Sequence, residues 1–157
     1  MPEKETLERA RRDAKAGKAP STQAGEFVRE EFEHIREGKH GARSTKQAIA
    51  IGLSKARRAG VNLPAPKAGR TSARTRQQAA RDTRKGHSSK RAAPSRKRSA
   101  ATLRALKKET RSAASHRALA RQAKGAARKR SHADRSRQAK KAARTRRASR
   151  GATGGSK

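Results

Sequence analysis

The stretch GEFVREEFEHIREGKHGARSTKQAIAIGLSKARRAGVNLP, residues 25–64, decides the fold because it holds most of the large apolar side chains. At about 100° per residue, the apolar positions of its first half fall within an arc of about 140° on one side of a helix. These positions are Phe27, Val28, Phe32 and Ile35. We therefore predict an amphipathic helix that ends near residue 37, before two turn glycines.

The second half of the stretch predicts another helix, over residues 45–59, although its apolar residues also alternate as in a strand. Ser44 and Gln47 have the spacing of a capping box, and Gly60 follows two arginines where a helix end is expected. Ile51 points roughly 200° away from its apolar neighbour two positions earlier. It therefore contacts either a charged helix predicted at the N-terminus, within residues 1–20, or a second copy in a homodimer. The predicted hairpin core consists of Phe27, Val28, Phe32, Ile35, Ile49 and Leu53.

These patterns predict a mostly α protein, namely a small αα-hairpin followed by a long disordered or conditionally helical basic tail. Residues 64–157 contain only three large apolar side chains, Leu103, Leu106 and Leu119, so they have little to bury. The predicted segments are a charged helix (1–20), the helical hairpin (21–63), a basic Pro/Ser/Arg linker (64–98), an Arg/Lys/Ala-rich helical tail (99–150) and a flexible Gly-rich end (151–157).

The charge of the chain is very uneven. It has 45 Lys and Arg against 12 Asp and Glu, a formal net charge of +33. Residues 1–37 hold eight basic and nine acidic side chains, so the remaining 120 residues carry +34. Such an excess of positive charge favours a polyanionic partner. Nucleic acid is the candidate, because lysine and arginine that neutralise its phosphates release condensed counterions and so bind without recognising the bases.

A tandem repeat organises the tail. Residues 115–130 and 131–146 align without gaps and are identical at ten of sixteen positions. On a helix, each copy places three basic residues on one face, and Ser131 with Asp134 predicts a helix break between the copies. The predicted nucleic-acid contacts are Lys46, Arg57, Arg58, Arg76, Arg81, Arg117, Arg121, Lys124, Arg128, Arg130, Arg137, Lys140, Lys141, Arg144, Arg146 and Arg147.

The binding mode follows from side-chain type. Arginine makes up 28 of the 45 basic residues, which suits phosphate contacts and narrow minor grooves. The two aromatic residues, Phe27 and Phe32, belong to the expected core, so stacking on single-stranded bases is disfavoured. Sequence-independent binding to duplex DNA is the mode that we expect.

Catalysis, cofactors and metals are not expected. The chain has no cysteine, and the histidines at 34, 40, 87, 116 and 132 have no recognised ligand spacing. Glu30 and His34 lie four residues apart, which predicts a surface ion pair. No apolar stretch is long enough for a membrane span or a signal peptide, which favours a cytoplasmic location at the nucleoid.

Lys46 to Gly60, KQAIAIGLSKARRAG, resembles the core of a bacterial family of small basic proteins that is assigned a domain of unknown function. The chain departs from that core at Gly52, where alanine is usual. Members are often labelled DNA-binding proteins, and this resemblance implies the same here. The tail also looks like the Lys/Ala-rich extensions of histone-like proteins and linker histones.

We therefore expect a non-enzymatic, histone-like, nucleoid-associated DNA-binding protein. An RNA- or ribosome-associated protein would have a similar composition and is the first alternative. A protein-interaction module anchored by its tail is the second. A membrane-surface polycation is the least favoured, because the basic helices lack an apolar face that would enter lipid.

Overall fold

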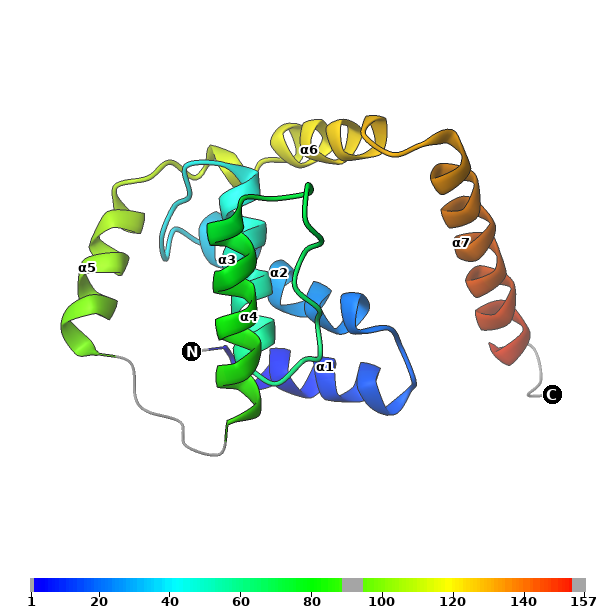
Figure 1. The fold of residues 1–157 in the computed structure, drawn as a ribbon, viewed down its shortest axis with the longest axis horizontal. Coiled ribbons are helices and arrows are strands. Elements are labelled where there is room, and N and C mark those ends of the chain that lie inside the picture. The colour runs from blue at the N-terminus through cyan, green and yellow to red at the C-terminus, as the bar shows by residue number, and fades with distance from the viewer. Residues whose placement is uncertain (1, 89–94, 154–157) are drawn as a thin grey trace. The chain divides into compact units, whose positions relative to one another are not determined.

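The computed structural model describes residues 2–88 and 95–153, and the regular structure in them is helical. By contact density the chain divides into two units, residues 1–119 and 120–157. The elements in chain order are α1 Lys4–Lys15, α2 Pro20–Arg36, α3 Thr45–Arg58, α4 Ala73–His87, α5 Arg96–Lys107, the short 3₁₀ turn η1 Ser112–Ala114, α6 His116–Arg128 and α7 His132–Thr153 (Figure 1).

Both helices of the predicted hairpin are present as α2 and α3. The α3 cap has the predicted form, since Ser44 Oγ accepts a hydrogen bond of 3.2 Å from the Gln47 N–H. Gln47 Oε1 in turn accepts from the Arg43 N–H at 2.8 Å. Helix α2 begins at Pro20 and has no side-chain cap, because its N-cap residue, Ala19, has no polar side chain. Proline suits the first helical position because its φ is fixed and it lacks an N–H.

The hairpin residues divide between two apolar clusters. Phe32 and Ile35 pack with Ile49 in one, whereas Phe27 packs with Leu53 in the other. Phe27, Phe32 and Ile35 are buried, and Val28, Ile49 and Leu53 are partly buried. Helix α1 adds Leu7 and Ala10 to the second cluster, so the hairpin does not form its core alone.

Helices α2 and α3 cross very closely at Gly52. A Cβ at this position would lie 2.7 Å from Val28 Cα and 3.0 Å from the Phe27 carbonyl oxygen. Glycine therefore lets the two backbones approach closely at this position.

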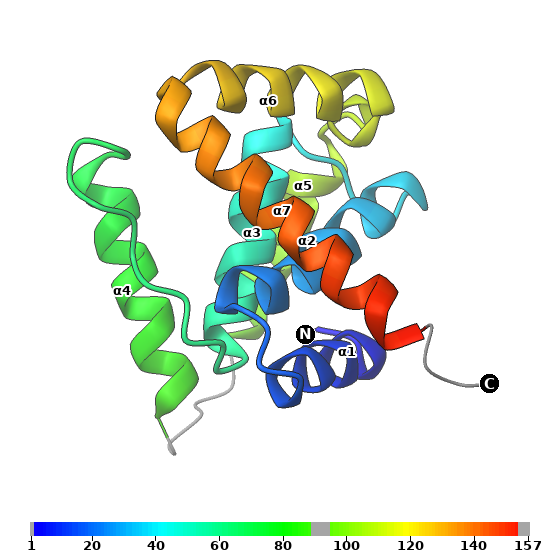
Figure 2. The ribbon, with the colours of Figure 1, turned by 90° about the vertical axis from the view of Figure 1, so that its right-hand side faces the viewer.

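The expectation of a small αα-hairpin followed by a disordered or conditionally helical tail is wrong. Helix α4 lies inside the stretch predicted to be a linker, and it packs along α3 (Figure 2). Asp82 of α4 is only 1% exposed. Its carboxylate accepts hydrogen bonds from Ser54 Oγ at 2.7 Å, Arg58 Nε at 2.7 Å and Gln78 Nε2 at 3.1 Å.

The segment after α5 is also held, and it is held by backbone atoms. The Gly41 N–H donates to the Leu106 carbonyl at 2.9 Å, and the Ala42 N–H donates to the Thr110 carbonyl at 3.0 Å. Ala113 and Ala114 are buried in the cluster of Phe32. Small residues and backbone hydrogen bonds thus hold this segment in place. It has few large apolar side chains, so its sequence does not predict that it packs against a core.

The predicted break between the two repeats is confirmed. Helix α6 ends at Arg128 and α7 begins at His132. Ser131 Oγ accepts from the Asp134 N–H at 3.1 Å and donates to Asp134 Oδ2 at 2.8 Å, so the pair caps α7. None of the described helices is long and apolar enough to cross a lipid bilayer.

Candidate functional site

Helix α6 presents one cationic stripe. Its basic residues recur at spacings of four, three and four positions, which places them within an arc of about 60°. All of them are exposed, and alanines and Leu119 occupy the opposite side, where side chains are partly buried. The stripe consists of Arg117, Arg121, Lys124 and Arg128.

Helix α7 carries cations on two opposite sides. Arg137, Lys140 and Arg144 share one face, as the repeat predicts, and all three are exposed. Arg137 is also paired with Asp134, one turn earlier. Arg135 and Arg146 lie about 180° away from that face. The remaining predicted contacts, Lys141 and Arg147, are exposed as well.

The predicted nucleic-acid-binding residues outside α6 and α7 differ in whether their charged groups are exposed and unpaired enough to contact phosphate. Lys46, Arg81 and Arg130 are exposed, and Arg130 Nη1 donates to Gln138 Oε1 at 2.5 Å. Arg76 is half-buried and bonds the Thr71 carbonyl at 2.9 Å. Arg58 is half exposed, but its Nε pairs with buried Asp82.

Arg57 is a structural residue. It is 6% exposed, and it donates to the carbonyls of Leu63 and Pro64 at 3.2 Å each. Burial lowers its pKa, while nearby Asp82 opposes that shift. Its hydrogen bonds fix the chain that leaves α3, so we leave Arg57 out of the proposed interface.

A buried polar cluster lies between α2 and α3, where α2 carries two adjacent buried acids. Glu30 is 1% exposed and Glu31 is 0% exposed. Lys55 Nζ of α3 lies 3.1 Å from Glu30 Oε1 and 2.7 Å from Glu31 Oε2. Burial opposes the charge on Lys55, but Glu31 and Glu30 outweigh it, so the pKa of Lys55 is raised.

The Glu31 carboxylate is unusual within the described chain, because neither of its oxygens accepts a hydrogen bond of normal geometry. The contact with Lys55 has the distance of an ion pair without that geometry. Buried carboxylates normally have hydrogen-bond donors on both oxygens. Glu31 therefore has unused capacity to bind a cation.

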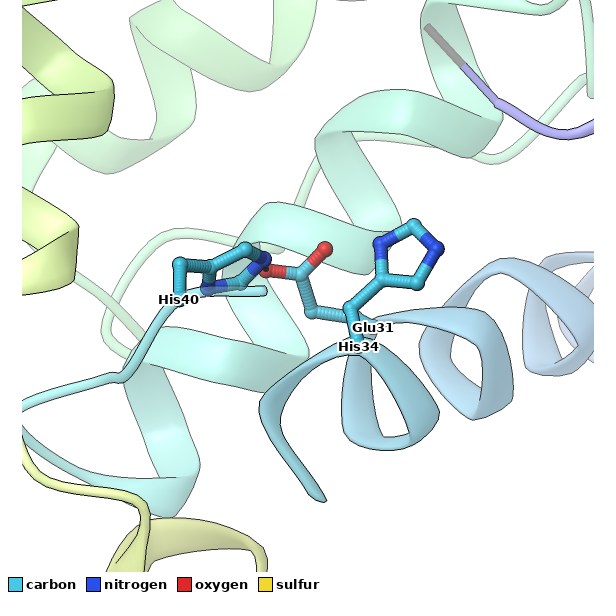
Figure 3. Close-up of side chains that lie close together, drawn as sticks. All are labelled: Glu31, His34 and His40. Atoms are coloured by element: carbon cyan, nitrogen blue, oxygen red, sulfur yellow. Dashed lines mark ion pairs between the residues drawn. The ribbon is translucent and has the colours of Figure 1, made fainter. Parts of the chain in front are cut away.

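Two histidines flank this carboxylate (Figure 3). His40, from the loop after α2, places Nε2 3.4 Å from Glu31 Oε1, and its Nδ1 lies 3.0 Å from the Gly41 carbonyl. His34 Nε2 lies 2.8 Å from Glu3 Oε1. Hydrogen bonds from His34 and Lys39 lower the pKa of Glu3 to about 2, so this carboxylate is ionised.

The predicted surface ion pair between Glu30 and His34 is wrong. His34 pairs with Glu3 instead, and Glu30 is buried against Lys55. The sequence does contain a signal for the actual arrangement, because Glu31 and His34 have the Glu-x-x-His spacing that places both on one helix face. A search for spacings between histidines alone does not find it.

A family model matches the part of the chain that contains α2 and α3. Residues 15–68 match a family of unknown function (DUF6496). The likeness to a family of unknown function is thereby confirmed for α2, α3 and the loop between them. The match carries no statement about DNA. No curated protein matches the chain, and no solved structure does.

Proposed function

We propose that this chain is a non-enzymatic protein that binds duplex DNA without sequence preference and is located at the nucleoid. The observation that carries this proposal is the α6 stripe of Arg117, Arg121, Lys124 and Arg128. Four exposed cations on one helix face, with no acid between them, fit a row of backbone phosphates.

The rare acids of the basic half strengthen this proposal. After residue 37 the sequence has only Asp82, Glu109 and Asp134. Asp82 is buried and paired with Arg58, and Asp134 caps α7 and pairs with Arg137. Two of the three carboxylates are therefore used to hold helices, and the exposed cations face a polyanion with little internal competition.

The type of nucleic acid follows from what the surface lacks. Phe27 and Phe32, the only phenylalanines of the sequence, are buried, so neither ring is available for base stacking. Proteins that bind single strands without preference depend on such stacking. Phosphate contacts by arginine and lysine support a duplex as the ligand.

The distribution of charge on α7 supports compaction. Its cations lie on two opposite sides, with Arg137, Lys140 and Arg144 on one and Arg135 on the other. A helix charged on both sides can contact phosphates of two neighbouring duplex segments. That geometry fits a histone-like accessory role better than recognition of a single site.

The test compares two variants that remove the same charge. The first replaces Arg117, Arg121, Lys124 and Arg128 by Gln. The second, its matched control, does the same at the exposed α1 region with Lys4, Arg11, Arg12 and Lys15. Affinity for a duplex of about 30 base pairs is measured by fluorescence anisotropy across a salt series.

We expect the α6 variant to bind about 100-fold more weakly at moderate salt, with a salt slope lower by about 3 to 4. The control is expected to change affinity by less than about 5-fold, because those residues lie in the near-neutral part of the chain. Equal losses in both variants would show that net charge, and not the stripe, governs binding. Duplex RNA and single-stranded DNA of equal length serve as further ligands, and tighter binding to RNA would favour the RNA-associated alternative.

A further inference from the structure

We propose that Glu31, His34 and His40 form a binding site for one divalent transition-metal ion, and that Zn²⁺ suits the ligand set best. Each residue offers one ligand atom, and these atoms all lie within 4.8 Å of one another. The inference is independent of DNA binding, because the cluster lies in α2 and the following loop.

The hydrogen bonds around the histidines leave the correct nitrogens for a metal. The Gly41 carbonyl can only accept, so His40 Nδ1 carries a proton, and the neutral form of His40 would direct the lone pair of Nε2 toward Glu31. The Glu3 carboxylate, 2.8 Å from His34 Nε2, is the acceptor for this ring nitrogen in the same way. The other ring nitrogen of His34 turns toward Glu31 (Figure 3).

With both histidines in these neutral tautomers, three electron-pair donors converge within 4.8 Å of one another. Metal-bound histidines normally donate their second N–H to a carboxylate or a backbone carbonyl. His34 has the first kind of partner and His40 has the second. Lys55 pairs with Oε2 of Glu31, which leaves Oε1, beside His40 Nε2, for the ion.

The local charge also fits a divalent ion. The cluster connects four carboxylates with two ammonium groups, so two negative charges remain when the histidines are neutral. Such an excess is unexpected in a chain with a net charge of +33. The acids are Glu3, Glu30, Glu31 and Glu37, and the ammonium groups belong to Lys39 and Lys55.

The ligand types select the class of metal. Two imidazoles and one carboxylate suit Zn²⁺ and its first-row neighbours, whereas Mg²⁺ and Ca²⁺ prefer oxygen ligands alone. The chain has no cysteine, so thiolate sites for softer metals are excluded. With ligand bonds of about 2.0–2.1 Å, tetrahedral ligand atoms lie about 3.3 Å apart, so shifts of about 1 Å would close the set.

An ion here would be placed to order the loop between α2 and α3. His40 belongs to that loop, and the next two residues hold Leu106 and Thr110 through their backbone N–H groups. A surface hollow reaches one of the proposed ligands, and it is lined by Gly38, His40, Gly41, Lys107, Glu109, Thr110 and Arg111. Metal binding is therefore expected to stabilise the packing of the chain after α5.

The test titrates the full chain, without a histidine tag, with Zn²⁺ against a chromophoric chelator, and with Co²⁺ followed by visible absorption. We expect one tight equivalent, and at least about 100-fold weaker binding in His34→Gln and in His40→Gln. His87→Gln is the matched control, because His87 is exposed on α4 and remote from the cluster in sequence and contacts. Saturating Zn²⁺ should raise Tm by about 5–10 °C in the wild type and not in His40→Gln.

Glu3→Gln provides a second variant in case a histidine variant does not fold. Glu3 is about half exposed, so its loss spares the core and should weaken Zn²⁺ binding about 10-fold through His34. The proposal is overturned if the wild type shows no single saturable equivalent. It is equally overturned if His34→Gln and His40→Gln bind Zn²⁺ as the wild type does, since binding would then involve other groups.

Discussion

Replacing Lys55 by methionine is expected to lower the free energy of unfolding by about 3–5 kcal/mol. Lys55 Nζ lies within 3.1 Å of both Glu30 and Glu31, which are 1% and 0% exposed. Methionine keeps the apolar length of the side chain but leaves two buried carboxylates without their cation. The loss is a large part of the about 5–15 kcal/mol that holds a typical domain together.

The measurement is urea unfolding followed by far-UV circular dichroism, with a chelator present so that no metal contributes. Lys46→Met is the matched control, because Lys46 is exposed in the first turn of the same helix. It should change stability by no more than about 0.5 kcal/mol. Adding Glu30→Gln and Glu31→Gln to Lys55→Met should recover most of the loss. A Lys55→Met chain as stable as the wild type would contradict the role given to this ion pair.

Gly86→Ala is expected to separate α4 from α3. A Cβ at this position would lie 1.9 Å from the Arg57 carbonyl oxygen, and backbone on both sides leaves no side chain that can move away. The helices must therefore shift apart, which breaks the bonds of Asp82 to Ser54 and Arg58. We expect a loss of about 2–3 kcal/mol, because overpacking against backbone outweighs the helix propensity of alanine.

Limited trypsin digestion followed by mass spectrometry measures the docking of α4 directly. Cleavage after Arg81 and Arg84, which are exposed on α4, should be at least about 10-fold faster in Gly86→Ala. Gly125→Ala is the matched control, since Gly125 is helical with nothing within 4 Å of its added Cβ. That change should stabilise α6 by about 0.5–1 kcal/mol. Unchanged cleavage in Gly86→Ala would mean that α4 does not pack as described.

The parts of the fold that depend on local patterns could be predicted from the sequence. The amphipathic spacing located α2, and the Ser44 cap located α3. Ser131 and Asp134 located the break before α7. In each case the signal lies within a few residues of the feature, so spacing alone is informative.

The order of the tail could not be predicted in this way. Large apolar side chains are the usual sign of a core, and the tail has few of them. Its packing depends instead on buried alanines, on backbone hydrogen bonds and on Gly41 and Gly86, where any side chain would collide with the backbone of another segment. Close backbone contacts between distant segments leave no periodic pattern, because each needs only one glycine on one side.

The two candidate sites differ in the same way: one has a local sequence pattern, and the other depends on contacts between distant segments. The α6 stripe repeats at helical spacing, so the sequence gives its members directly. The histidine cluster combines Glu31 and His34 of one helix with His40 of a loop and Glu3 from before α1. No spacing connects Glu3 to His34, and only the packing of α1 on α2 brings them together.

The backbone contacts at Gly41 and Gly86 mean that the fold and the cationic surface use different atoms. Carbonyl and amide groups hold the segments that follow α3 and α5, whereas the charged ends of most exposed arginines and lysines stay outside those contacts. The surface composition is thus free to drift between arginine, lysine and neutral residues without unfolding the scaffold. Evolution could therefore change the affinity for a polyanion over a wide range while the fold remains the same.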